Sequence, residues 1–263
     1  MATPALTVMS RTELASPALA PYSAAQLRFS CAAWPMRAAE ELRSALIFRA
    51  LTRASKQAGM PEPWPRRFAS AVKDEVRHAR LCATVGQQLR AGPPRYDPTA
   101  VRLRLASLPD ATTRTAALLL VEVAIGETIS MCLFRAGRRA AVEPLTRATL
   151  GSILRDEARH QRLGWTGFAC LWDLLPEPSR EIARREAARG LATCERQIAP
   201  ALQWLQRGEP FDPAYAALGV LHPEVRVETF YFAVERLVLP RLTRLGIDGP
   251  TAWENRYRER AGA

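Results

Sequence analysis

One ten-residue pattern occurs twice in the chain, and it restricts the fold more than any other feature of the sequence. The two copies are VKDEVRHARL at 72–81 and LRDEARHQRL at 154–163, and both contain Asp-Glu-x-Arg-His. The chain has only three histidines, and two of them lie in these copies. Within each copy the glutamate and the histidine are three residues apart. In a helix this spacing puts both side chains on one face, about one turn apart.

The composition favours helices over strands. Aromatic residues make up 7% of the 263-residue chain, glycine is scarce, and Ala, Leu, Arg and Glu are abundant. These abundant residues are good helix formers, whereas strands prefer β-branched and aromatic residues. Apolar residues make up 48% of the chain, which is enough for a full core in one large domain or in a domain with an appendage.

Breaker residues and hydrophobic periodicity predict six helices. They lie at 35–58, 66–89, 111–139, 144–175, 180–206 and within 223–242. The connection 91–110 is long and is expected to hold a short helix near TAVRLRLASL, and Pro240 is expected to end or kink the last helix. The predicted organisation is a loosely ordered arm at 1–30, a helical bundle at 31–175 and a helical extension at 176–263.

The first four predicted helices form two helical hairpins that are copies of one sequence repeat. The first helix contains ELRSALIFRA at 41–50 and the third contains ETISMCLFRA at 127–136, and both read E-x-x-S-x-x-x-F-R-A. The second and fourth helices carry the repeated Asp-Glu-x-Arg-His. The repeat therefore predicts a pseudo-twofold arrangement of two hairpins, joined by the long 91–110 connection.

The repeated motifs supply two carboxylate–imidazole pairs, Glu75 with His78 and Glu157 with His160. A redox-active transition metal accepts such a mixed oxygen and nitrogen set. One E-x-x-H is a weak signal in a helical chain rich in alanine and arginine. Two copies, each preceded by aspartate and each with its own upstream glutamate, are a strong signal of a two-metal site.

Two further carboxylates are needed to complete such a site, and the repeat offers two candidate pairs. Glu41 and Glu127 occupy equivalent positions in the repeated E-x-x-S-x-x-x-F-R-A context, so they are the preferred ligands. Glu40 and Glu122 form the rival pair, because their separation matches that of the two E-x-x-H motifs. Glu122 and Glu127 lie about 140° apart around a helix, so both cannot face one metal pair squarely.

Four more residues are candidates for the surroundings of the metals. Asp74 and Asp156 precede the motif glutamates, and each is expected to accept a hydrogen bond from the histidine of the other motif. The rival interpretation is that each aspartate only pairs with a nearby surface arginine. Ser44 and Ser130 follow the preferred glutamates by three residues; they are either small packing residues or hydroxyls lining a pocket. His222 precedes Pro223 and is interpreted as a helix cap or a surface residue.

The chain resembles the ferritin-like di-iron carboxylate superfamily, and in particular bacterial ferritin-like domain proteins of the type found in myxobacteria. DEVRHARLC at 74–82, GETIS at 126–130 and DEARH at 156–160 carry the resemblance, which covers residues 38–165. It implies an all-α fold: a ferritin-like four-helix bundle with a long crossover and additional C-terminal helices. The implied metal ligands are Glu41, Glu75, His78, Glu127, Glu157 and His160.

The resemblance implies two iron ions, with an Mn/Fe pair as the alternative, and a non-haem di-iron oxidoreductase that activates O2. The expected reaction is oxidation or monooxygenation, N-oxygenation included, of a small organic substrate, because the C-terminal helices could wall a pocket. The first alternative is a ferroxidase, an iron-handling protein or a rubrerythrin-like peroxide reductase. The second is a non-enzymatic helical module that binds nucleic acid.

The charge and the cysteines set the remaining expectations. The net charge is +11 and almost all of it is arginine, which favours acidic partners such as a ferredoxin that donates electrons or a carrier protein. Nucleic acid is not the expected partner. Five cysteines without a C-x-x-C pair fit a reducing cytoplasm, and no apolar run is long enough to predict a membrane span. The oligomeric state stays open, with a homodimer among the options.

Overall fold

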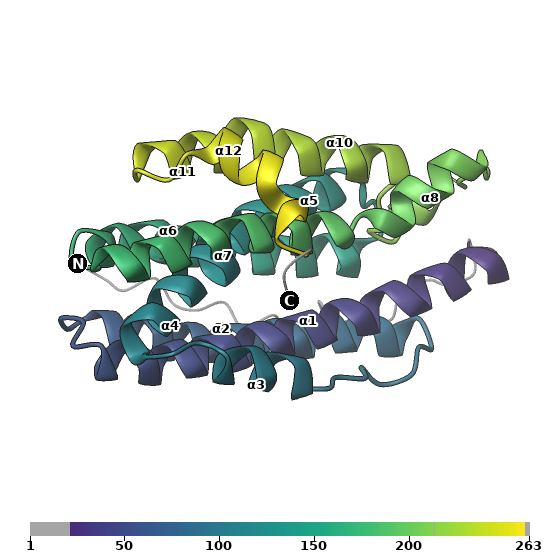
Figure 1. Ribbon diagram of the computed structural model, residues 1–263. Helices are drawn as coiled ribbons and strands as arrows, with labels where there is room; N and C mark the ends of the chain where they lie inside the picture. Colours follow the sequence, from purple (N-terminus) through teal and green to yellow (C-terminus); the bar gives the residue numbers. More distant parts are fainter. Residues whose placement is uncertain (1–21, 213, 261–263) are drawn as a thin grey trace, which may run out of the picture.

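The protein is helical throughout the part of the chain that its structure describes. The structure is a computed structural model in which residues 22–212 and 214–260 are described, and all regular elements within these ranges are helices. The all-α prediction is therefore confirmed. Figure 1 shows the helices in layers, with the N-terminal hairpin at the bottom and the last helices, in yellow, at the top.

The N-terminal hairpin consists of α1 (Ala24–Gln57) and α2 (Trp64–Gln88), which pack along each other. The predicted start of the first helix at residue 35 is wrong, because α1 begins at Ala24 and includes Pro35. The helix continues through the proline because its neighbourhood is packed: Trp34 is fully buried, and its indole N–H donates to the Leu218 carbonyl at 3.0 Å. Of the predicted arm, residues 1–21 lie outside the described residues.

The crossover carries a short helix, as predicted, and leads into a long third helical stretch. The short helix is α3 (Thr99–Ala106). The stretch consists of α4 (Ala111–Ala117), η1 (Leu118–Gly126) and α5 (Glu127–Ala140). Its limits agree with the predicted 111–139, but η1 is a π-helix, which the sequence did not predict. A π-helix is wider than an α-helix and changes the direction of the side chains that follow it.

The fourth long helix is α6 (Pro144–Trp172), which packs against η1, α5 and α2. Glu143 caps its first turn, because the carboxylate accepts hydrogen bonds from the amides of Leu145 and Thr146. The helix approaches η1 very closely at Gly164. A Cβ atom there would lie 2.5 Å from the Ala124 amide nitrogen, so glycine is required for this contact.

The C-terminal helices lie against the third helical stretch. The elements are α7 (Glu177–Arg196), α8 (Ala199–Arg207), α9 (Ala214–Ala217), α10 (Pro223–Ala233), η2 (Val234–Val238), α11 (Leu239–Arg244), α12 (Gly249–Glu254) and η3 (Asn255–Arg260). α7 packs on α4 and η1, α10 packs on α5 and α8, and both α12 and η3 pack on α7. The single helix predicted at 180–206 is wrong, since α7 ends at Arg196 and α8 starts anew with Pro200 in its first turn.

The stretch formed by α4, η1 and α5 is long and apolar enough to cross a membrane by length and composition alone. Most of it is covered by protein, because 67% of its most apolar window is buried inside the fold. A core helix has the same properties, so its apolar character is explained by the contacts with α6 and α7.

Candidate metal centre

Six acidic and histidine side chains from four helices meet in the interior of the protein. α1 contributes one glutamate, α5 contributes another, and α2 and α6 each contribute a glutamate and a histidine. All six side chains are buried, although isolated carboxylates are rarely removed from water. The structure thus brings together all the residues that the sequence nominated as ligands: Glu41, Glu75, His78, Glu127, Glu157 and His160.

The cluster divides into two groups that share two glutamates. The first group contains Glu41, Glu75, His78 and Glu157, and its potential ligand atoms all lie within 4.8 Å of one another. His78 Nδ1 is 3.4 Å from a Glu41 oxygen, 3.2 Å from a Glu157 oxygen and 3.7 Å from a Glu75 oxygen. One imidazole nitrogen therefore faces three carboxylates.

The second group contains Glu75, Glu127, Glu157 and His160 within the same distance limit. His160 Nδ1 lies 2.8 Å from a Glu75 oxygen and 3.5 Å from a Glu157 oxygen. Since Glu75 and Glu157 belong to both groups, each of them can bridge two neighbouring cation positions. The two histidine rings lie 5.9 Å apart between centroids, one in each group.

Several polar atoms at the centre of the cluster lack a hydrogen bond. Both histidine Nδ1 atoms, one oxygen of Glu75 and one oxygen of Glu157 are buried without a hydrogen-bond partner. His160 Nδ1 and Glu75 Oε1 are close enough for a hydrogen bond, but they are not aligned for one. Buried polar groups are normally satisfied, and these four nitrogen and oxygen atoms are of the kinds that metal ions accept as ligands, so the cluster fits a metal-binding site.

The two aspartates stand behind the histidines, on the side away from the glutamates. Asp156 on α6 lies 3.1 Å from Nε2 of His78 on α2, and Asp74 on α2 lies 3.3 Å from Nε2 of His160 on α6. The structure therefore has the crossed contacts that the repeat predicted. In the neutral imidazole, a carboxylate at Nε2 favours the proton on that nitrogen. The lone pair of Nδ1 is then directed at the cluster.

Two arginines close the outer side of this arrangement, and they also follow the crossed pattern. Arg77 pairs with Asp156, and Arg159 donates to Asp74 at 2.7 Å. Each aspartate thus accepts from a histidine and from an arginine at once, so the two interpretations of the aspartates given by the sequence hold together. Arg77 also donates to Ser152 at 3.1 Å, which ties α2 to α6.

The electrostatics of the cluster reflect carboxylates crowded in a dry interior. Burial, together with the neighbouring glutamates, raises the pKa of Glu41 and Glu127 far above the ordinary value for glutamate. Burial alone would lower the pKa of His160, but contacts with Asp74, Glu157 and Glu75 outweigh it and raise the pKa to about 11. Without cations the cluster therefore retains protons, and divalent cations would displace them.

The rival pair of ligands lies elsewhere. Glu122 points to two arginines, with Arg43 at 2.6 Å and Arg104 at 3.5 Å, and Glu40 is exposed. Neither belongs to the two groups described above. Glu122 lies in η1 and Glu127 opens α5, and the two carboxylates have different partners: arginines for Glu122 and the Glu/His cluster for Glu127. Ser44 and Ser130 are half-buried, and the role of either hydroxyl in a pocket stays a prediction.

Sequence reasoning missed the residues that hold η1 next to the site. The Thr128 hydroxyl donates to the Ala124 carbonyl at 2.6 Å and accepts from Gln161 at 3.0 Å and from Trp165 at 2.9 Å. These hydrogen bonds attach Thr128, the residue next to Glu127, to two successive turns of α6. Thr128 lies within the quoted GETIS segment, but the pattern gave no indication of its partners.

The arrangement can hold two divalent cations with oxygen and nitrogen ligands. Four carboxylates and two imidazoles match what redox-active transition metals accept, and the dry interior limits access of water to them. A scan against protein-family models gives no match for this chain, and a search of the curated proteins gives none either.

Proposed function

We propose that the protein is a non-haem di-iron oxidoreductase that uses O2 to oxidise a small organic substrate. The observation that carries this proposal is the pair of buried Glu/His groups that share Glu75 and Glu157. Two iron ions in these groups would supply redox equivalents and open coordination positions for reaction with oxygen. The ligands would be the six clustered residues, with Mn/Fe as the alternative pair.

We further propose that the helices around the cluster form a ferritin-like four-helix bundle. Its members would be α1, α2, the third helical stretch η1–α5, and α6. The support is the distribution of side chains: one glutamate from each of two helices and an E-x-x-H from each of the other two, which is the pattern of such bundles. The connection that contains α3 would be the crossover between the two hairpins.

The charge of the cluster supports two divalent ions. Four glutamates carry four negative charges when all are ionised, and two divalent cations neutralise them. A single divalent ion would leave an excess of negative charge that is removed from water, at a cost of several kcal/mol per unpaired ion. The pKa of Glu41 and of Glu127 is raised for a related reason, because burial disfavours the ionised carboxylates and the neighbouring glutamates add to this effect.

The protein's own residues have distinct tasks in this proposal. Asp74 and Asp156 orient the histidines and keep the ring proton on Nε2. Phe48 packs against His160, with 5.1 Å between ring centroids, and closes the site on the α1 side. The C-terminal helices would cover the third helical stretch and wall the substrate side. Electrons would come from an acidic donor such as a ferredoxin.

The proposal is tested by elemental analysis of the full chain expressed with iron, together with an anaerobic ferrous titration. We expect close to two irons per chain, proton release on loading, and optical changes on exposure to oxygen. Glu75→Ala should lose two-metal loading, because this side chain serves both groups. Glu122→Ala is the matched control, since it removes a glutamate that pairs with arginines and should retain both irons.

The alternatives give different results in the same experiment. Many irons per assembly would favour iron storage, and consumption of peroxide without an organic substrate would favour a peroxide reductase. No stoichiometric metal in the wild-type protein would refute the central claim. Loss of metal in Glu122→Ala, with retention in Glu75→Ala, would refute the assignment of the ligands.

A further inference from the structure

A pocket lined by arginines lies on the outside of α5 and α6, away from the Glu/His cluster. It has a volume of about 530 Å³ and is lined by Arg135, Arg138, Arg139, Arg147, Gly151, Leu154 and Arg155. The lining contains five guanidinium groups and no carboxylate. Sites for small molecules have volumes of roughly 300–1,000 Å³, so the pocket is large enough for more than a single phosphate group.

The five arginines have no acidic partner among the residues that the structure describes. None of them forms an ion pair with a carboxylate in the described part of the chain, although many other arginines do. The nearest acidic residues along the chain are engaged elsewhere: Glu143 accepts from the backbone at the start of α6, and Asp156 pairs with Arg77 and His78. The pocket therefore holds an uncompensated positive charge.

The end of α5 accounts for only a small part of this charge. A helix C-terminus carries about half a negative charge, and Arg138 and Arg139 lie in the last turn of α5. Arg147 satisfies the free carbonyls there, since it donates to the Arg138 carbonyl at 3.4 Å and to the Ala141 carbonyl at 3.2 Å. Half a charge cannot balance five guanidinium groups, and all five are exposed, so an anionic ligand from solution can reach them.

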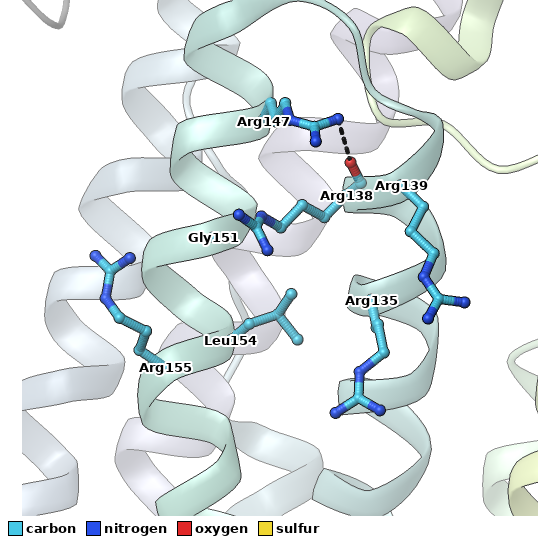
Figure 2. Close-up of a pocket in the computed structure, with 7 residues that line it drawn as sticks. All are labelled: Arg135, Arg138, Arg139, Arg147, Gly151, Leu154 and Arg155. Atoms are coloured by element: carbon cyan, nitrogen blue, oxygen red, sulfur yellow. Dashed lines mark hydrogen bonds between the residues drawn. The ribbon is translucent and has the colours of Figure 1, made fainter.

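The pocket is also shaped by the absence of a side chain. Figure 2 shows Arg138 extending from α5 across to Gly151 on α6, with Arg135 about one turn away on α5 and Leu154 facing the space between the helices. A Cβ atom on Gly151 would lie 3.0 Å from Nε of Arg138. The glycine thus provides the surface on which the guanidinium lies, and Leu154 offers an apolar contact beside it.

We propose that this pocket binds a small molecule that carries a pyrophosphate group. The planar fork of a guanidinium matches two phosphate oxygens at once, and Arg135 and Arg138 are placed to bind neighbouring phosphates. Two linked phosphates use the volume and the charge of the site better than one. The apolar or organic part of the ligand would lie against Leu154. This site is independent of the proposed metal centre and of the reaction there.

The test is isothermal titration of the full chain with inorganic pyrophosphate at physiological salt, with inorganic phosphate for comparison. We expect saturable binding of one pyrophosphate per chain, tighter than that of phosphate. The Arg135→Gln/Arg138→Gln variant should bind pyrophosphate at least about tenfold more weakly, because each charge-assisted bond is worth about a factor of ten or more. Arg135→Lys/Arg138→Lys keeps the charge and should still lose affinity, since lysine lacks the fork.

The control is Arg49→Gln/Arg53→Gln, which removes the same charge from positions on α1 outside the pocket lining. It should change affinity less than about twofold, because a charge that does not contact the ligand acts only through salt-screened attraction. Urea denaturation of every variant reports whether the fold is retained. Equal losses in the pocket and control variants would overturn the proposal, because they would show a general effect of charge. Failure of pyrophosphate to saturate the protein would also overturn the proposal. Tight binding of a single-stranded oligonucleotide that competes with pyrophosphate would overturn it too, because it would assign the pocket to nucleic acid.

Discussion

Replacement of Gly164 by alanine tests the contact that sets the position of the third helical stretch. The added Cβ would lie 2.5 Å from the amide nitrogen of Ala124 and 2.7 Å from the carbonyl carbon of Val123. Carbon atoms in good contact are 3.5–4.0 Å apart, so the new atom is about 1 Å too close. The obstacle is the backbone of η1, which cannot avoid the clash by a change of rotamer.

The size of the effect follows from two opposing terms. Overpacking costs about 1–3 kcal/mol, and a clash with backbone belongs near the upper end of that range. Alanine in place of glycine inside a helix gains about 1 kcal/mol. The free energy of unfolding should therefore fall by about 2 kcal/mol in Gly164→Ala, as measured by urea denaturation. The metal content should also fall, because Glu127 follows η1 directly and moves with it.

Gly167→Ala is the matched control, three residues further along α6. Its Cβ would meet only side-chain atoms, with Leu119 Cδ2 at 3.2 Å and Trp64 Cζ3 at 3.3 Å. Small rotations of these side chains can relieve the contact, so the gain in helix propensity roughly cancels the cost. Equal stability and equal metal content of the two variants would refute the reasoning about the close approach of α6 and η1.

Two further predictions concern single carboxylates. Asp156→Asn should weaken metal binding by about 10–100-fold in a competition titration, because the Asp156 carboxylate orients the His78 ring through Nε2. The control is Asp173→Asn at an exposed position. Equal metal affinity of the two variants would contradict the orienting role of Asp156. Glu195→Gln should remove a pH-dependent part of the stability. Burial acts to raise the pKa of Glu195, but hydrogen bonds from Arg256 and two tyrosines outweigh it and lower the pKa. The stabilisation is then present above pH 4.5 and lost as the pH falls below that value, so the difference in unfolding free energy from wild type should shrink on acidification. A constant difference from pH 7 to pH 3 would exclude this linkage.

The repeated motif predicted which residues lie together in the cluster, because helical spacing is a local property. Glu75 and His78 must share a face if their segment is a helix, and the duplicated context identified Glu41 and Glu127 without any knowledge of the packing. His222 was also predicted correctly as a cap, since its Nδ1 accepts from the Glu224 amide at 3.2 Å. These predictions needed only short-range geometry.

The features that the sequence did not predict depend on tertiary contacts. Pro35 reads as a helix start, and only the burial of Trp34 explains why α1 continues through it. The run LLLVEVAIG at 118–126 has no mark that separates a π-helix from an α-helix. Its geometry is fixed by Thr128, which binds the Ala124 carbonyl, and by the fit of Gly164 against the same turn. The arginine-lined pocket likewise required two helices to be placed side by side.

The crossed aspartates explain why the motif includes Asp and Arg as well as the two ligands. Each copy of Asp-Glu-x-Arg-His gives its glutamate and histidine to the cluster and its aspartate to the histidine of the other copy. The arginines also reach across, with Arg77 on Asp156 and Arg159 on Asp74, and Arg159 donates in addition to Asp156 of its own copy at 3.0 Å. In the structure, the aspartate four residues before each histidine contacts the histidine of the other helix and not the one that follows it. Correct packing of α2 on α6 is therefore a condition for an ordered site, and the motif has to occur in both helices.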